Sequence, residues 1–133
     1  SSIDIPTTVL NILNIKSRDQ PPAMQGYDLT PILKTPNEIV RDCCIVEDDV
    51  DTLKDATGFP PFRARTMITD KYRMTVYQGR KETGDLYDLE NDPYEIQNLW
   101  HDENFREVRN RLLNKLLHEI INIDDRPVRQ ARA

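Results

Sequence analysis

The stretch FRARTMITDKYRMTVY, residues 62–77, decides the fold of this chain. Each half alternates with a period of two, which is the pattern of a β-strand that buries one face. Asp70-Lys71 lies between the halves as a turn, so the stretch predicts a β-hairpin. In the first half one face carries Phe62, Ala64, Thr66 and Ile68, and in the second half one face carries Tyr72, Met74 and Val76.

The segments on either side extend this hairpin into a sheet. Residues 85–89 (DLYDL) follow a polar loop and predict a third strand, and residues 41–46 (RDCCIV) suit a short strand before the hairpin. The acidic run 47–51 comes next. It lacks the spacing, the central glycine and the closing glutamate of an EF-hand, so we expect a solvated acidic loop rather than a calcium site.

A long helix is expected after the sheet. Residues 102–123 carry apolar side chains at three- and four-residue steps, which predicts an amphipathic helix. Its start is either a capping box of Asn104 and Glu107 or a cap at Asp102. We expect Trp100, just before the helix, to staple the preceding turn onto the sheet or the helix.

A short helix is expected near the first residue. Asp4 can cap it, and Pro6 fits its first turn. The helix is expected to end near Ile15, and prolines then make residues 16–37 an irregular connector. Its apolar face consists of Ile5, Val9, Ile12 and Leu13.

Together these elements predict an α+β fold. We expect a three- to four-stranded antiparallel sheet packed by a long C-terminal amphipathic helix, preceded by a short N-terminal helix and a connector. The 133 residues, 38% hydrophobic and 31% charged, suit one domain with a modest core.

The charge and the ends of the chain narrow the class of protein. A net charge of −5 argues against nucleic acid or an anionic membrane as a partner. No apolar run approaches the roughly 20 residues of a membrane span, and the first residues do not form a signal peptide. Because the chain also lacks an initiator methionine, we expect it to be part of something longer.

No catalytic constellation can be assembled from the sequence. Cys43 and Cys44 are adjacent, which strains a disulfide and fits no zinc spacing. His118-Glu119 begins a stretch like H-E-x-x-H, but Asn122 stands where the second histidine belongs. His101 has no serine or cysteine nucleophile positioned with it. We therefore assign no catalytic, cofactor-binding or metal residue to this segment.

Basic and aromatic residues of the hairpin are the candidates for binding an anion. If Arg63, Arg65, Arg73 and Tyr77 shared one sheet face, their guanidinium groups would suit sulfate, phosphate or carboxylate. The alternative is a solvated face whose arginines form cross-strand pairs with Asp85 or Glu82.

The signature segment, residues 84–99, carries a resemblance. Its run GDLYDLENDPYE, followed by Asn98-Leu99, resembles the C-terminal signature G-E-L-Y-D-L-x-x-D-P-x-E-x-x-N-L of the sulfatase family, with Asp85 in place of glutamate. Residues 2–10 (SIDIPTTVL) and 25–29 (QGYDL) resemble two further segments of that family, in the same order. The matching residues are Gly84, Leu86, Tyr87, Asp88, Leu89, Asp92, Pro93, Glu95, Asn98 and Leu99.

This resemblance implies the C-terminal region of an arylsulfatase-like protein of the alkaline phosphatase superfamily. Such a parent hydrolyses sulfate esters with a formylglycine nucleophile and calcium. Residues 43–47 lack the proline and arginine of the formylglycine segment, so we expect neither cofactor in this chain. We expect the segment to be non-catalytic, to support the catalytic domain and to line the substrate entrance.

The resemblance also suggests boundaries and partners. Residues 1–40 would be the end of the large catalytic domain, residues 41–125 the small C-terminal subdomain, and residues 126–133 a frayed basic tail. The partners would be the missing catalytic domain and a sulfate-ester substrate, and the isolated chain would dimerise or swap through its unpaired apolar stripe.

Two other functions compete with this interpretation. One is a free-standing binding module that uses the arginine-bearing face, and the other is the tail of a phosphonate or phosphodiester hydrolase of the same superfamily. An independent small hydrolase would need a nucleophile, a base and an orienting group, which the sequence does not supply.

Overall fold

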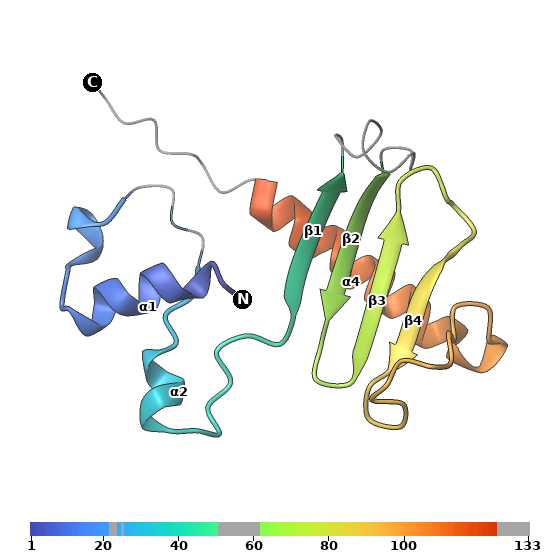
Figure 1. The fold of residues 1–133 in the computed structure, drawn as a ribbon, viewed down its shortest axis with the longest axis horizontal. Coiled ribbons are helices and arrows are strands. Elements are labelled where there is room, and N and C mark those ends of the chain that lie inside the picture. The colour runs from blue at the N-terminus through green and yellow to red at the C-terminus, as the bar shows by residue number, and fades with distance from the viewer. Residues whose placement is uncertain (22–23, 25, 51–61, 125–133) are drawn as a thin grey trace. The chain divides into compact units, whose positions relative to one another are not determined.

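The computed structural model describes residues 1–21, 24, 26–50 and 62–124 (Figure 1). The chain divides into two compact units, Ser1–Asp42 with Ile120–Ala133, and Cys43–Glu119. The predicted basic tail, residues 126–133, lies outside the described residues.

The second unit is built on a four-stranded antiparallel sheet. The strands follow one another in the order β1-β2-β3-β4, so the sheet is a meander. At the predicted turn between β2 and β3, the Tyr72 amide donates a 2.8 Å hydrogen bond to Thr69 Oγ1. The strands are β1 (Cys44–Val50), β2 (Phe62–Ile68), β3 (Tyr72–Tyr77) and β4 (Gly84–Asp88).

The long C-terminal helix, α4, spans Arg106–Asp124 and follows a 3-10 turn, η2, at Glu103–Phe105. Asp102 caps this turn, since its carboxylate accepts a 2.9 Å hydrogen bond from the Asn104 amide. Of the two predicted caps, the structure therefore has Asp102. Within the described part of the chain, no helix has the length and apolar character needed to cross a membrane.

The core lies between α4 and one face of the sheet. The register places Met67 beside Met74 and Met74 beside Leu86, and none of these three side chains is exposed. Figure 1 shows α4 running across the sheet, and two of its side chains, Leu112 and Leu116, are buried as well. The opposite face carries the intervening residues of each strand.

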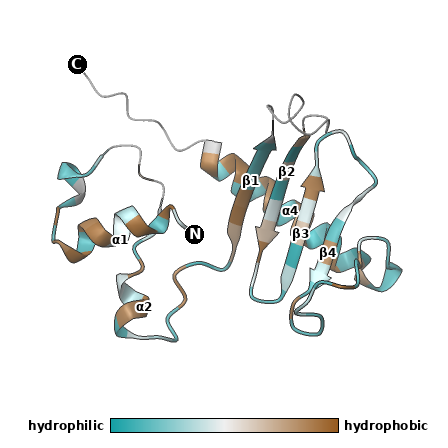
Figure 2. Ribbon diagram, viewed as in Figure 1, coloured by the Kyte–Doolittle hydropathy of each residue, from teal (hydrophilic) through white to brown (hydrophobic). Residues whose placement is uncertain are grey.

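Strand β1 lies further along the chain than the sequence predicted, since it begins at Cys44 rather than Arg41 and ends at Val50 rather than Val46. The expected acidic loop from Glu47 onward is wrong, because the strand continues to Val50. The Arg65 guanidinium lies 3.2 Å from Glu47 Oε1 and 2.6 Å from Asp49 Oδ1, which holds the acidic end of β1 against β2. Figure 2 shows β1 changing from hydrophobic to hydrophilic along its length. Cross-strand ion pairs thus offset the low strand propensity of acidic residues.

The first unit contains α1 (Asp4–Ile12), η1 (Ser17–Asp19) and α2 (Thr30–Lys34). The prediction that Asp4 caps α1 is wrong: the cap position is Ile3, and no side chain caps the helix there. Asp4 lies inside the first turn and its carboxylate turns to the connector instead. The predicted α+β class, with its antiparallel sheet, long C-terminal helix and short N-terminal helix, is confirmed.

Candidate functional site

The signature segment folds as β4 followed by a tightly bonded turn, and Asn98 joins its two ends. The Asn98 Oδ1 atom accepts hydrogen bonds from the amides of Leu86 and Trp100, at 3.1 and 3.0 Å. Its Nδ2 atom donates to the Gly84 carbonyl and to the Asp85 carboxylate, at 3.1 and 2.9 Å. Both polar atoms of the amide are therefore engaged in holding the chain beside β4.

Two aspartates hold the turn itself. Asp88, which is buried, accepts hydrogen bonds from the amides of Glu90 and Asn91, at 3.1 and 3.2 Å. Burial acts to raise the pKa of Asp88, but the hydrogen bonds from Asn91 and Glu90 outweigh it, and the pKa lies below its usual value of 3.8. Asp92 accepts a 2.8 Å hydrogen bond from the Gln97 amide. Both carboxylates therefore have a structural role.

Gly84 and Trp100 form a close contact that no larger residue permits. A Cβ atom on Gly84 would lie 2.5 Å from Trp100 Cζ3 and 2.7 Å from the Thr75 carbonyl oxygen. The Trp100 Nε1 atom donates a 3.0 Å hydrogen bond to the Glu82 carbonyl. Trp100 thus staples the turn onto the sheet, as its position in the sequence predicted.

Every second residue of β2 lies on the same face of the sheet, so Arg63 and Arg65 share the face of Met67, which carries the core. Both pair with β1: Arg63 Nε lies 3.9 Å from Asp49 Oδ2, and Arg65 contacts Glu47 and Asp49. These are cross-strand pairs, as the alternative interpretation expected, but the partners come from β1 rather than from the β4 side of the sheet.

Arg73 and Tyr77 lie on the face opposite α4. Arg73 Nη2 lies 2.6 Å from Glu95 Oε2, and the guanidinium stands 5.2 Å from the centre of the Tyr87 ring. The Tyr77 hydroxyl donates a 2.5 Å hydrogen bond to Asp85. This bond, together with burial, raises the pKa of Tyr77 to about 12.

The four residues predicted to form one anion-contacting face therefore divide into two pairs. The register sets Arg65 opposite Val76 and Ile68 opposite Arg73, and opposed residues share a face. The prediction that the four residues share one face of the sheet is therefore wrong. A two-residue turn pairs odd-numbered residues of β2 with even-numbered residues of β3, and this signal was present in the sequence. Contact of an anion with these residues stays a prediction.

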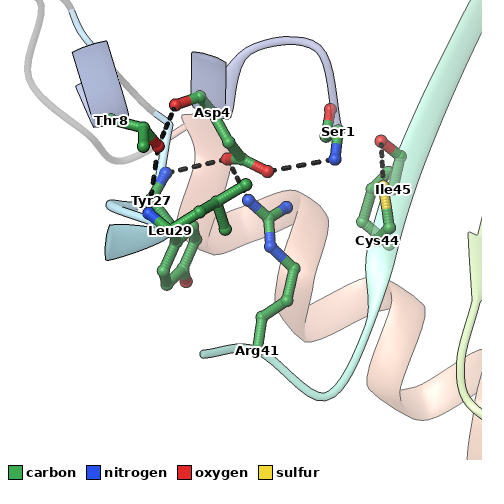
Figure 3. Close-up of polar contacts among 8 residues, drawn as sticks. All are labelled: Ser1, Asp4, Thr8, Tyr27, Leu29, Arg41, Cys44 and Ile45. Atoms are coloured by element: carbon green, nitrogen blue, oxygen red, sulfur yellow. Dashed lines mark hydrogen bonds and ion pairs between the residues drawn. The ribbon is translucent and has the colours of Figure 1, made fainter. Parts of the chain in front are cut away.

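In the first unit, the buried carboxylate of Asp4 joins three segments of the chain by hydrogen bonds. Asp4 Oδ1 accepts a 2.8 Å hydrogen bond from the Tyr27 amide and another from the Arg41 guanidinium (Figure 3). The guanidinium also stands 4.4 Å from the centre of the Tyr27 ring. Thr8 extends the cluster, since its hydroxyl donates to the Asp4 carbonyl and accepts from the Leu29 amide.

The pKa of Asp4 reflects these contacts. Burial acts to raise it, but the hydrogen bond from the Tyr27 amide and the charge and hydrogen bond of Arg41 lower it below the usual 3.8. Sequence reasoning missed this cluster. Its one local signal was an aspartate in a helical first turn, which also suits a cap.

Helix α1 buries a polar face and exposes an apolar one. Its buried side chains are Asp4 and Thr8. The predicted apolar stripe is exposed instead, with exposed fractions of 60% for Ile5, 46% for Val9, 53% for Ile12 and 63% for Leu13. This arrangement leaves an exposed apolar stripe on the first unit.

Metal ligands and paired cysteines are two features that a reaction centre can use. In residues 1–21, 24, 26–50 and 62–124, no group of three or more His, Cys, Asp or Glu side chains could hold a metal ion. Cys43 and Cys44 are not joined in a disulfide. The described residues therefore do not fit the calcium site that the resemblance implies for the parent.

Comparison with known families and proteins adds a family match. The family model described as "N-sulphoglucosamine sulphohydrolase, C-terminal" matches residues 1–122. No curated protein matches the chain.

Several solved structures share the fold. One is BT4656, solved in complex with its substrate D-glucosamine-2-N,6-O-disulfate: it is 16% identical with a TM-score of 0.74, covering 97% of this chain and 25% of that one. A candidate sulfatase from Bacteroides thetaiotaomicron VPI-5482 is 20% identical with a TM-score of 0.74, covering 92% and 25%. BT1596, a 2-O GAG sulfatase, is 19% identical with a TM-score of 0.70 and the same coverages. The chain thus spans about a quarter of the length of these proteins.

Proposed function

The chain belongs to the family of N-sulphoglucosamine sulphohydrolase C-terminal domains, and from this premise we propose that it is the non-catalytic C-terminal part of a sulfatase that hydrolyses sulfate esters. The observation that carries the proposal is the family match across residues 1–122. The bonding of Asn98 and Asp88 supports it, because these signature residues hold backbone rather than face a reacting group.

The reaction centre of this sulfatase would lie in the part of the polypeptide that the chain does not span. That part would carry the formylglycine nucleophile and the calcium ion expected for the family. This division is supported by the length of the matched structures, of which the chain covers 25%. The segment would then act by supporting the catalytic domain.

We propose that the first unit belongs with the catalytic domain. Residues 1–40 would form the end of that domain, residues 41–125 the small subdomain and residues 126–133 its tail. The division of the chain between Asp42 and Cys43 supports the first boundary. The exposed stripe of Ile5, Val9, Ile12 and Leu13 supports the assignment, since an apolar surface of this kind is stabilised by packing against a larger body.

Sulfated amino sugars are the substrate class we propose. The description of the matching family names N-sulphoglucosamine, and BT4656 was solved in complex with a disulfated glucosamine. Arg73 and Tyr77, on the face opposite α4, would line the substrate entrance. The contact of Arg73 with Glu95 and Tyr87 supports this role, since it fixes the guanidinium before a substrate arrives.

The proposal is tested by measuring sulfate release. The longer enzyme that carries this segment is expected to release sulfate from an aryl sulfate and from glucosamine 6-sulfate, and this chain alone is expected to release none. Robust turnover by the chain alone would overturn the proposal. So would a longer enzyme that cleaves phosphonates or phosphodiesters and leaves sulfate esters intact.

A further inference from the structure

A pocket of about 300 Å³ opens in the second unit, between the β3–β4 connection and the start of α4. The residues that line it include the basic Lys81 and Arg109 and the ring-bearing Trp100 and His101. Glu82 and Glu103 contribute the acidic side chains. The volume is at the lower end of the range for small-molecule sites and suits a ligand the size of one sugar ring.

One wall of this pocket is fixed by bonds within the chain. The Arg109 guanidinium donates a hydrogen bond to the Trp100 carbonyl and stands 5.7 Å from the centre of the Trp100 ring. The indole in turn bonds to the Glu82 carbonyl and packs against Gly84. The position of the Arg109 charge is therefore set before any ligand enters, which lowers the entropy lost on binding.

The charges that line the pocket favour an anion. Glu103 faces Arg106, whose Nη1 atom lies 3.4 Å from its carboxylate. Among the described residues that line the pocket, Lys81 and Arg109 then stand against the Glu82 carboxylate. The Glu82 carboxylate can accept hydrogen bonds from hydroxyl or ammonium groups on the same ligand.

We propose that this pocket binds a single anionic sugar unit. A sulfate or carboxylate group would lie between Lys81 and Arg109, because guanidinium and ammonium donors match such oxygens. A hydroxyl or amino group of the sugar ring would bond to Glu82. The choice of a sulfated sugar rests on the proposed function, whereas the pocket and its charges do not.

Trp100, the single tryptophan of the chain, reports binding directly. Its fluorescence is followed while the chain is titrated with glucosamine 6-sulfate, with glucosamine and with inorganic sulfate. We expect a saturable change with glucosamine 6-sulfate and at least tenfold weaker binding of the other two probes. Equal affinity for inorganic sulfate would overturn the proposal of a sugar site, and no saturable change with any probe would overturn the site itself.

Variants locate the site within the chain. Lys81→Gln is expected to weaken binding of glucosamine 6-sulfate at least tenfold, and Arg109→Gln to do the same. Arg111→Gln is the matched control, because Arg111 is an exposed base on the same helix that does not line the pocket. Circular dichroism establishes that each variant is folded, and Lys81→Gln carries the test if Arg109→Gln unfolds. Equal binding by Lys81→Gln and the parent chain would overturn the proposal.

The binding experiment and the sulfate-release assay test the two proposals independently of each other. If the longer enzyme releases sulfate but Trp100 reports no binding, the pocket proposal is wrong and the sulfatase proposal stands. If the pocket binds glucosamine 6-sulfate and the longer enzyme releases no sulfate, the sulfatase proposal is wrong, and the pocket remains a sugar-binding site.

Discussion

Arg73 on β3 and Glu95 in the signature turn form an ion pair, with 2.6 Å between Nη2 and Oε2. Glu95 has a φ of 55°, a left-handed backbone that non-glycine residues seldom adopt. The pair therefore holds a strained residue in place and anchors the turn to the sheet. On either side of it, Tyr94 and Ile96 are held outward, with 85% and 83% of their surface exposed.

Replacing Glu95 measures the contribution of this pair. Glu95→Gln is expected to lower the free energy of unfolding by about 0.5 kcal/mol, because both side chains are about one-third exposed. Glu90→Gln is the control, since its pair with Lys71 has the same 2.6 Å distance but lies further in solvent. Urea unfolding, followed by Trp100 fluorescence, should show the Glu95 effect shrink in high salt. A larger cost for Glu90→Gln would contradict the argument.

Gly84 is predicted to be the least replaceable glycine of the second unit's described residues. Gly84→Ala places a Cβ atom 2.5 Å from the Trp100 ring and is expected to cost about 3 kcal/mol in unfolding free energy, through overpacking. Gly79→Ala separates packing from backbone strain. Gly79 has a φ of 76° with open space around its Cβ position, so we expect a cost of about 1 kcal/mol there. Equal costs in urea unfolding would show that the Trp100 contact is unimportant.

The regular elements were predictable because their signals are local. The alternation of residues 62–77 and the three- and four-residue steps of residues 102–123 each indicate the type of element without knowledge of distant segments. Alternation did not show which face of β2 is buried, because the core face is that of Met67 and not that of Phe62, Ala64, Thr66 and Ile68. β1 was only partly predictable. Its extension to Val50 depends on Arg65 of the next strand, and an acidic run taken alone favours a loop.

The candidate site was less predictable because its contacts join distant residues. Asp4 and Arg41 are 37 residues apart, and no periodicity links them. The division of Arg65 and Arg73 between two faces was available from the length of the turn, but alternation within each strand does not reveal it. The bonds of Asn98 follow from the turn geometry, which only the folded chain supplies.

The buried carboxylate of Asp4 should hold the connector against α1. Asp4→Asn removes the charge that faces Arg41 and is expected to cost about 3 kcal/mol in the local stability of the first unit. Hydrogen exchange at the amides of Tyr27 and Leu29 measures this loss. Asp19→Asn is the control, since Asp19 is largely exposed. Unchanged exchange at Tyr27 in the Asp4 variant would rule out this role.

The carboxylate of Asp4 should also make the local stability of the first unit depend on pH. The pKa of Asp4 in the folded chain lies below 3.8, so its stabilisation is complete above the pKa of the unfolded chain. The stabilisation is lost as the pH falls through the folded pKa. We therefore expect faster exchange at Tyr27 in acid than at neutral pH, after correction for intrinsic rates. Asp4→Asn should remove that acceleration.

The exposed stripe of α1 should make the isolated chain associate. We expect sedimentation velocity to show an association that increases with concentration and is abolished by Ile5→Lys with Val9→Lys. Leu33→Lys is the control, because Leu33 is 68% exposed but lies on α2, outside the stripe. A chain that sediments as a monomer at every concentration would contradict the prediction.

Tyr77 should make stability fall at high pH. Its hydroxyl donates to Asp85, and this bond, with burial, raises its pKa from 10.0 to about 12. The folded chain therefore holds the phenolic proton more tightly than the unfolded chain does. The contribution is fully present below about pH 10 and is lost as the pH rises towards 12.

Comparison with Tyr77→Phe isolates this contribution from other alkaline effects. The stability difference between the parent chain and the variant should be constant below about pH 9 and should shrink or reverse above about pH 11, where the unfolded tyrosine is ionised. Urea unfolding at several pH values measures it. Asp85→Asn should make this loss smaller and complete it at a lower pH, because the carboxylate no longer raises the pKa of the folded tyrosine. Parallel pH curves for the parent chain and Tyr77→Phe would show that the Tyr77–Asp85 bond does not control the titration.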